Sequence, residues 1–200
     1  MKKHGYLGLF ALVVLACVLL VVSCRPEAPP DEARTIPITP TEELNLTGIP
    51  PEEVDIDAYR LTVDGLVDNP LSLTYDEIMA YPAVTEVVLL ICPGVFNDDA
   101  EWTGVPLWAI LQDAGVSPEA TEVSLRAMPV PLAGSYTNVA SKPYTVNLPL
   151  EKVMGNDSIF LAHTVNGEVL PLEHGFPLRL VAKDRFGYDW VKWVEGITVE

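Results

Sequence analysis

Short strand-like segments, separated by glycine and proline, run through most of this sequence and restrict its fold more than any other feature. Residues 59–64 alternate apolar and polar side chains and stop at Gly65, which is the pattern of a half-buried strand. Asn166-Gly167 lies between two further segments, 158–165 and 168–170, and predicts a hairpin. Other strands are expected at residues 71–73, 87–91, 122–127, 178–182 and 190–199.

Short helices are predicted between these strands. Thr74 and Glu77 have the spacing of a capping box, which opens a helix that continues to Met79. Pro106 before a second segment and Gly115 after it are residues that commonly begin and end helices. The predicted helical segments are residues 74–79, 107–114 and 150–154.

These elements indicate a β-rich α+β fold of mixed short strands with a few short helices for residues 58–200. A domain of this length buries roughly two-thirds of its unfolded surface, which is enough for an unaided core. The run 87–91 is continuous and apolar, so we expect that strand to be buried on both faces. Cys92-Pro93-Gly94 ends it.

The first 23 residues have the pattern of a secretory signal. Lys2 and Lys3 precede an uncharged apolar run, 6–22, and polar sequence begins after Ser23-Cys24. Cys24 resembles the lipidated cysteine of a bacterial lipobox, and Cys17 is a rival site that would leave an apolar tail on the mature protein. An uncleaved anchor helix and ordinary signal cleavage are the other interpretations. Each of them places the domain outside the cytoplasm.

Residues 24–57 form a proline- and acid-rich stretch that we interpret as a tether. Seven of the 18 prolines fall between residues 25 and 57, and this stretch contains no aromatic residue. Such a segment buries too little apolar surface to offset the entropy lost on ordering. We therefore expect a semi-extended spacer between a membrane and the domain, with packing of its last part onto the domain left open.

The charge balance excludes two classes of partner. The chain has 12 Lys and Arg against 28 Asp and Glu, a net charge of −16, which becomes −18 when Lys2 and Lys3 leave with the signal. A nucleic-acid-binding protein needs a basic face, so no nucleic-acid partner is expected. The same field repels an anionic bilayer, so acyl chains rather than charge would hold the protein at a membrane.

Cys92 is the only free thiol of the mature domain if Cys24 is acylated. It follows an apolar strand and lies in a Pro-Gly turn, a position that can present a side chain to a cleft. An unpaired cysteine in an exported protein calls for an explanation. From the local sequence, Cys92 is a small buried hydrophobe, a thiolate metal ligand or a nucleophile.

Three polar residues near the C-terminus are weaker candidates. His174 and Arg179 flank Gly175 and Pro177, which fix backbone that can approach a ligand closely. Lys192 lies between two apolar residues on the last strand, so it belongs either to a solvent-facing side of that strand or to an anion site.

Eight pieces follow one another in a recognisable order: 63–70, 73–78, Cys92 with 102–107, 160–171, 174–181, 186–187, 191–193 and Ile197. With these pieces, residues 59–200 resemble the molybdopterin-binding domain of the sulfite oxidase family of oxidoreductases. The resemblance adds to the predicted fold the expectation of a sulfite-oxidase-type molybdopterin-binding topology.

The resemblance also implies roles for the candidate residues. Cys92 matches the thiolate that binds molybdenum beside the two dithiolene sulfurs of the pterin, which makes it the metal ligand and the catalytic centre. His174, Arg179 and Lys192 match residues that hold the pterin and its phosphate. Soft sulfur suits a metal that changes oxidation state, and Arg and Lys suit a phosphate. The molybdenum–molybdopterin cofactor would carry oxygen-atom transfer coupled to two electrons.

The sequence departs from the family at three places. The tether occupies the position of a segment that contacts the pterin in larger members. Asp98, Asp99 and Glu101 follow Cys92 where the family's substrate pocket often carries arginines. His163 stands where an aromatic residue is usual, and we expect it to be a core or surface residue rather than a ligand.

We therefore expect an extracytoplasmic molybdenum-cofactor oxidoreductase that transfers an oxygen atom as sulfite oxidases or sulfoxide reductases do. It would be held at the cell membrane of a bacterium or similar prokaryote by a lipid on Cys24. The acids after Cys92 and the −18 charge favour a neutral substrate such as a sulfoxide over sulfite. Expected partners are a small-molecule substrate and an electron-transfer protein or membrane partner subunit. The alternative is a non-catalytic membrane-anchored binding or assembly module that retains the fold without the cofactor, and the tether favours it.

Overall fold

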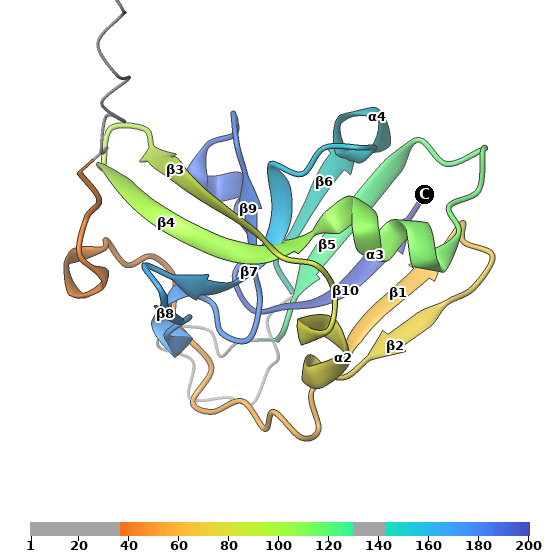
Figure 1. The fold of residues 1–200 in the computed structure, drawn as a ribbon, viewed down its shortest axis with the longest axis horizontal. Coiled ribbons are helices and arrows are strands. Elements are labelled where there is room, and N and C mark those ends of the chain that lie inside the picture. Colours follow the sequence, from red (N-terminus) through yellow and green to blue (C-terminus); the bar gives the residue numbers. More distant parts are fainter. Residues whose placement is uncertain (1–36, 130–142) are drawn as a thin grey trace, which may run out of the picture. The chain divides into compact units, whose positions relative to one another are not determined.

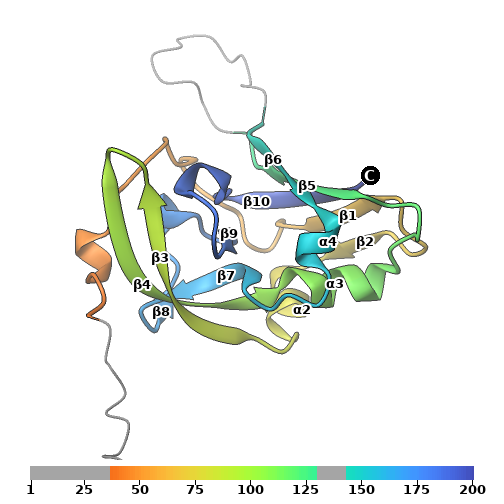
Figure 2. The same ribbon diagram turned by 90° about the horizontal axis from the view of Figure 1, so that it is seen from above.

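The strands of the described residues, 37–129 and 143–200, form two five-stranded sheets in this computed structural model (Figures 1 and 2). In the first sheet the order is β2-β1-β10-β5-β6, and in the second it is β3-β4-β7-β8, with β9 also paired to β7. The first sheet contains β1 (Leu61–Gly65), β2 (Leu71–Leu73), β5 (Glu122–Ala127), β6 (Thr145–Pro149) and β10 (Val194–Val199). The second contains β3 (Val84–Cys92), β4 (Phe96–Pro106), β7 (Ile159–Val165), β8 (Glu168–Val169) and β9 (Arg179–Ala182). The predicted signal peptide, Cys17 and Cys24 lie outside the described residues.

Short helices complete the fold, and their ends confirm the local sequence signals. Thr74 caps α2 through its hydroxyl, which accepts from the Glu77 amide at 3.2 Å, while the Glu77 carboxylate accepts from the Thr74 amide at 2.8 Å. Gly115 ends α3 with a φ of 69°, a conformation that favours glycine. The α-helices are α2 (Tyr75–Met79), α3 (Leu107–Ala114) and α4 (Leu150–Val153). The described residues also form three 3₁₀ helices of one turn each: η1 (Thr41–Glu43), η2 (Leu172–His174) and η3 (Gly187–Asp189).

The predicted α+β, β-rich fold is therefore confirmed, but the prediction for residues 87–91 is wrong. These residues lie in β3, which among the described strands pairs only with β4 and forms the edge of its sheet. Burial along β3 alternates, and the side chain of Leu89 is 42% exposed. A continuous apolar run does not distinguish a central strand from an edge strand, because periodicity reports burial and not the number of paired neighbours.

The sequence also gave no signal for β4, the neighbour of β3. Asp98, Asp99 and Gly104 are poor strand formers, and they conceal a two-residue alternation of buried positions. Gly104 lies at a register shift between β4 and β7, where a Cβ would lie 2.2 Å from the Leu161 carbonyl oxygen. Only glycine allows the two backbones to approach this closely.

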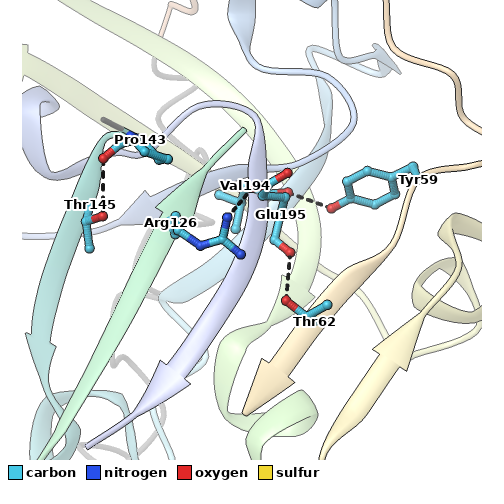
Figure 3. A network of polar contacts seen from close by, with 7 residues as sticks. All are labelled: Tyr59, Thr62, Arg126, Pro143, Thr145, Val194 and Glu195. Atoms are coloured by element: carbon cyan, nitrogen blue, oxygen red, sulfur yellow. Dashed lines mark hydrogen bonds and ion pairs between the residues drawn. The ribbon is translucent and has the colours of Figure 1, made fainter. Parts of the chain in front are cut away.

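A polar network fixes the start of β10 (Figure 3). The buried Tyr59 hydroxyl donates to the Val194 carbonyl at 2.6 Å, and Thr62 donates to the Glu195 carbonyl at 3.2 Å. Arg126 from β5 pairs with the Glu195 carboxylate. Burial, with Glu195 nearby, raises the pKa of Tyr59 far above its ordinary value, so the hydroxyl remains a donor. These contacts hold the chain immediately after residues 192 and 193 against β1 and β5.

Tyr59→Phe is expected to lower the free energy of unfolding of the cofactor-free protein by about 1–3 kcal/mol, because the Val194 carbonyl loses a buried donor. Chemical denaturation measures the change. Tyr188→Phe is the matched control, since the Tyr188 side chain is exposed and its change should stay within about 0.5 kcal/mol. Equal midpoints and slopes for both variants would contradict a structural role for the Tyr59 hydroxyl.

Residues 39–49, which we call the strap, lie against the second sheet (orange in Figure 1). The Thr39 amide donates to the Asp99 carbonyl at 2.6 Å, and the Asn166 side chain donates to the Thr39 carbonyl at 2.9 Å. Leu44 is buried in the core. The part of the sequence that we interpret as a tether therefore includes a segment packed onto the domain. Within residues 37–129 and 143–200, no helix has the length and apolar character needed to cross a membrane.

Candidate functional site

A cavity of about 390 Å³ draws its lining from both sheets and from the strap. Its wall includes residues 47–49, the end of β3 with the start of β4, the end of β5, the first residue of β9, and Gly187, Tyr188, Trp190, Lys192 and Trp193. Most of the lining side chains are aromatic or aliphatic. Cys92, Arg179 and Lys192 supply a thiol and two cationic groups within this mainly apolar wall.

Cys92 is the last residue of β3 and is partly exposed. The Val95 amide donates to the Cys92 carbonyl at 3.0 Å, and Gly94 adopts a φ of 76°, so the chain reverses immediately after the thiol. This hairpin end places the sulfur in the cavity wall. Among residues 37–129 and 143–200, no group of three His, Cys, Asp or Glu side chains could hold a metal ion. Cys92 thus presents one thiol rather than a complete ligand set.

Arg179 opens β9 and is only 4% exposed. Its Nη1 donates to the His174 carbonyl at 3.1 Å, whereas its buried Nε has no hydrogen-bond partner among the described residues. Burial lowers the pKa of Arg179 to about 10, although the Asp98 carboxylate acts in the opposite direction. Arg179 therefore adds to the cavity lining a desolvated cation whose Nε–H has no partner among the described residues.

Lys192 is 8% exposed and lies in the segment leading into β10. Its ammonium donates to the Glu173 carbonyl at 2.8 Å and to the Thr47 carbonyl of the strap. An ammonium has three N–H donors, so one is left without an acceptor among the described residues. Burial and the neighbouring Arg179 lower the pKa of Lys192 to about 7, despite the opposing effect of Glu173.

His174 does not belong to the residues that line the cavity, although it lies beside both cations. It is buried at the end of η2, and burial, followed by the charges of Arg179 and Lys192, lowers its pKa. Gly175 follows with a φ of 120°, and a Cβ there would lie 3.1 Å from the Arg179 Cβ and 3.2 Å from the Lys192 Cβ. A side chain at this position would press between the two cationic stems, so Gly175 allows them to converge.

The acids that follow Cys92 do not take part in the lining formed by the described residues. Asp98 is only 2% exposed and accepts from the amide and side-chain nitrogens of Asn45 at 2.8 and 2.9 Å. Asp99 accepts from the strap through its carbonyl. These residues fasten the strap, so they do not place carboxylates at the cavity as the sequence suggested.

Sequence reasoning did not identify two tryptophans and the strap as parts of the site. Trp102 of β4 and Trp190 face the Arg179 guanidinium, with ring centroids 5.0 and 5.7 Å from its Cζ. Thr47 and Ile49 enter the wall from the proline-rich region. His163 is buried in β7, and its Nδ1 contacts the Thr164 hydroxyl at 2.8 Å, outside the cavity lining.

Comparison with known proteins shows the family to which this chain belongs. A family model described as "Oxidoreductase molybdopterin binding domain" matches residues 47–200. The chain belongs to this family, and the family's molybdopterin cofactor is the one predicted from the sequence. The match begins within the strap, so it includes the strap residues that line the cavity.

Individual relatives agree with this assignment. The chain is 35% identical over 152 residues to the uncharacterized oxidoreductase YuiH of Bacillus subtilis, covering 76% of this chain and 70% of that one. It is 31% identical over 144 residues to the catalytic subunit MsrP of the protein-methionine-sulfoxide reductase of Gluconobacter oxydans, covering 70% and 46%. Rat mitochondrial sulfite oxidase is 29% identical over 207 residues, covering 91% and 37%. The chain therefore spans less than half the length of the last two relatives.

A solved structure supports the fold. The sulfane dehydrogenase SoxCD from Paracoccus pantotrophus superposes with a TM-score of 0.61 at 25% sequence identity, covering 90% of this chain and 58% of the solved chain. This similarity confirms the predicted sulfite-oxidase-type molybdopterin-binding topology.

The residues of the cavity fit the family's cofactor. The unpaired Nε of Arg179 and the remaining proton of Lys192 offer donors to an anionic group. The thiol of Cys92 would offer a soft ligand to the cofactor's metal. Gly175 leaves open the space between the cationic stems. Donor chemistry and burial thus agree with a group that is anionic at one end and metal-bearing at the other.

The free energy of unfolding of the cofactor-free protein should rise between about pH 7 and pH 9 because of Lys192. The native ammonium loses its proton near pH 7, whereas the unfolded side chain keeps it up to about 10.5. The unfolded state then binds more protons, so stability increases with pH. Denaturation of the wild type and of Lys192→Met across this range checks it. The variant should show a flatter pH dependence, and parallel curves would contradict the lowered pKa.

Proposed function

We propose that this protein is a molybdenum-cofactor oxidoreductase that transfers an oxygen atom to or from the sulfur of a small substrate. The observation that carries the proposal is the convergence of Cys92, Arg179 and Lys192 on one cavity, although 100 positions separate the first from the last. A ligand that carries a soft metal and an anionic group needs both a thiol and cations, and this fold brings one thiol and two buried cations together.

Each residue has a distinct role in this proposal. Cys92 binds the metal through its thiolate. Arg179 and Lys192 bind the anionic end of the pterin through Nε and Nζ. His174 supports this end indirectly, because its carbonyl fixes the Arg179 guanidinium and its buried ring lies beside both cations. When bound, the cofactor supplies oxygen-atom transfer coupled to two-electron chemistry.

The wall favours a neutral sulfur compound as the substrate. Met128, Tyr144 and Trp193 belong to the apolar part of the lining, which accommodates a thioether or sulfoxide more readily than a free anion. The net charge of −16 also lowers the encounter rate with anions. The relative named as a protein-methionine-sulfoxide reductase subunit supports the same substrate class. Reduction of a sulfoxide to a thioether consumes two electrons and two protons and releases water.

Turnover of the purified protein tests this function. A reduced viologen dye supplies electrons, methionine sulfoxide or dimethyl sulfoxide is the substrate, and dye oxidation is followed. We expect sulfoxide-dependent oxidation, and weaker turnover of sulfite with an electron acceptor. A protein that carries about one molybdenum per chain and turns over neither sulfoxides nor sulfite would contradict the proposal.

We also propose a location at the outer face of a prokaryotic cell membrane, through a lipid on Cys24. The support is the sequence of residues 1–24, with its two lysines, apolar run and cysteine. Mass spectrometry of the purified protein should find an acylated N-terminal cysteine at position 24. Cys24→Ser should release the protein from the membrane fraction, whereas Cys17→Ser should not. Release by the Cys17 variant alone would move the site to that residue.

Electrons would come from an electron-transfer protein or a membrane partner subunit, because each turnover needs two of them. The non-catalytic alternative rested on the tether in place of a segment that contacts the pterin. Thr47, Gly48 and Ile49 of that region line the cavity, and the Thr47 carbonyl accepts from Lys192. This contribution favours the enzyme over the binding module.

A further inference from the structure

The charge of Arg179 is buried without a carboxylate to neutralise it directly. No Asp or Glu oxygen of the described residues lies within 4.0 Å of its guanidinium. Asp98, the acid that influences it electrostatically, has its oxygens bonded to Asn45 instead. A buried charge in this situation needs another source of stabilisation.

Two tryptophans provide this stabilisation of the Arg179 cation. The Arg179 Cζ lies 5.0 Å from the ring centroid of Trp102 and 5.7 Å from that of Trp190, both within the range of cation–π attraction. The two rings also contact each other edge to face, with centroids 5.9 Å apart and planes at 77°. The guanidinium is therefore held by a pair of mutually packed aromatic rings.

Hydrogen bonds fix the position of one ring but not that of the other. The Trp190 Nε1 donates to the Ala182 carbonyl at 3.0 Å and to the Arg185 carbonyl at 3.3 Å, which ties this ring to the end of β9. The Trp102 Nε1 is buried and has no partner among the described residues. Packing alone therefore holds Trp102, so a change at this position breaks no hydrogen bond of the described structure.

We propose that Trp102 and Trp190 are positioning residues that stabilise the Arg179 cation while leaving its Nε donor free for the anionic end of the cofactor. A carboxylate in their place would neutralise the charge and accept the same N–H groups. A ring face attracts the cation without accepting those donors in the plane of the guanidinium. The inference rests on the proposed role of Arg179 and deepens it.

The chemistry of Trp102 allows a matched comparison. Trp102→Phe and Trp102→Leu both remove the indole and break no hydrogen bond, but only Phe retains an aromatic face. The measurement is the rate at which purified, cofactor-loaded protein loses molybdenum and pterin during dialysis. We expect the Leu variant to lose both about 2- to 30-fold faster than the Phe variant, the factor that corresponds to the usual range of cation–π energies.

Trp108 supplies the control, because it lies in α3, is partly buried and faces no cation of the described residues. Trp108→Phe and Trp108→Leu should lose the cofactor at equal rates. A double-mutant cycle adds a readout that a purely structural role would leave unchanged. In the Arg179→Met background, the difference between Phe and Leu at position 102 should shrink to less than about 2-fold, because no cation remains to be attracted.

Equal rates for Trp102→Phe and Trp102→Leu, or the same ratio in both backgrounds, would overturn the inference. If Trp102→Leu does not fold, the same comparison at position 190, between Trp190→Phe and Trp190→Leu, decides the question. A wild type that retains cofactor and loses it on Arg179→Met keeps the proposed function even when the tryptophan comparison fails. A folded wild type without molybdenum and pterin would overturn both.

Discussion

Cys92→Ser is expected to remove molybdenum from the purified protein and to lower turnover by more than about 100-fold. Loss of an outer-shell partner of a metal ligand already lowers metal affinity or activity by about 10- to 100-fold, and loss of the ligand itself should exceed this. A serine hydroxyl is a hard ligand that remains protonated at neutral pH, so it does not replace a thiolate. Elemental analysis and the dye assay measure the two effects.

The fold should survive this substitution, because Cys92 is partly exposed at the end of a hairpin and Ser is nearly the same size. Thermal unfolding of the cofactor-free variant should match that of the wild type. Pterin should be retained better than molybdenum, since Arg179 and Lys192 are unchanged. A Cys92→Ser protein with both its full molybdenum content and its full turnover would show that Cys92 is not a ligand of the metal.

Arg179→Met and Lys192→Met are expected to lower cofactor retention by about 10- to 150-fold each. This range corresponds to the roughly 1.5–3 kcal/mol of a hydrogen bond to a charged group. Methionine keeps the apolar stem and removes only the cation. Pterin fluorescence of the purified proteins measures retention. Lys152→Met is the control, because Lys152 is exposed on α4 and does not line the cavity.

Arg179→Met should lower cofactor retention, but it should not lower the free energy of unfolding of the cofactor-free protein. Without the cofactor, Arg179 is a buried cation whose Nε has no partner among the described residues, and replacing such a charge by an apolar side chain is often neutral or stabilising. The cofactor-free Arg179→Met protein should therefore unfold at a denaturant concentration equal to or above that of the wild type. Reduced retention together with unfolding of the cofactor-free variant would mean that Arg179 supports the fold rather than the ligand.

Local signals in the sequence were sufficient for much of the fold. The capping box at Thr74, the glycine after α3 and the alternation before Gly65 each depend on neighbouring residues, and each has its expected place in the structure. β4 was not predicted, because Asp98 occupies one of its inward positions. A buried aspartate there makes sense only with Asn45, 53 positions earlier, and no local pattern contains that pairing.

The candidate site, like the fold, was predicted in part, and the features that depend on distant contacts were missed. Cys92, Arg179 and Lys192 were found because ordered family motifs contain them, and the structure brings them to one cavity. The rings of Trp102 and Trp190 were not assigned a role, since the sequence does not tell which cation an aromatic residue will face. The strap was interpreted as spacer because its prolines and acids resemble disordered sequence. Its order comes from contacts with distant strands.

The enclosure around the candidate site also has a consequence for the timing of maturation. Its wall combines residues 47–49 with Trp190, Lys192 and Trp193, and the Lys192 ammonium donates to the Thr47 carbonyl, 145 positions earlier in the chain. While the ribosome has not yet made the lining residues around Lys192, the nascent chain cannot close this wall. Acquisition of the pterin then waits until both groups of residues have been made and have paired, and such long-range pairings form slowly.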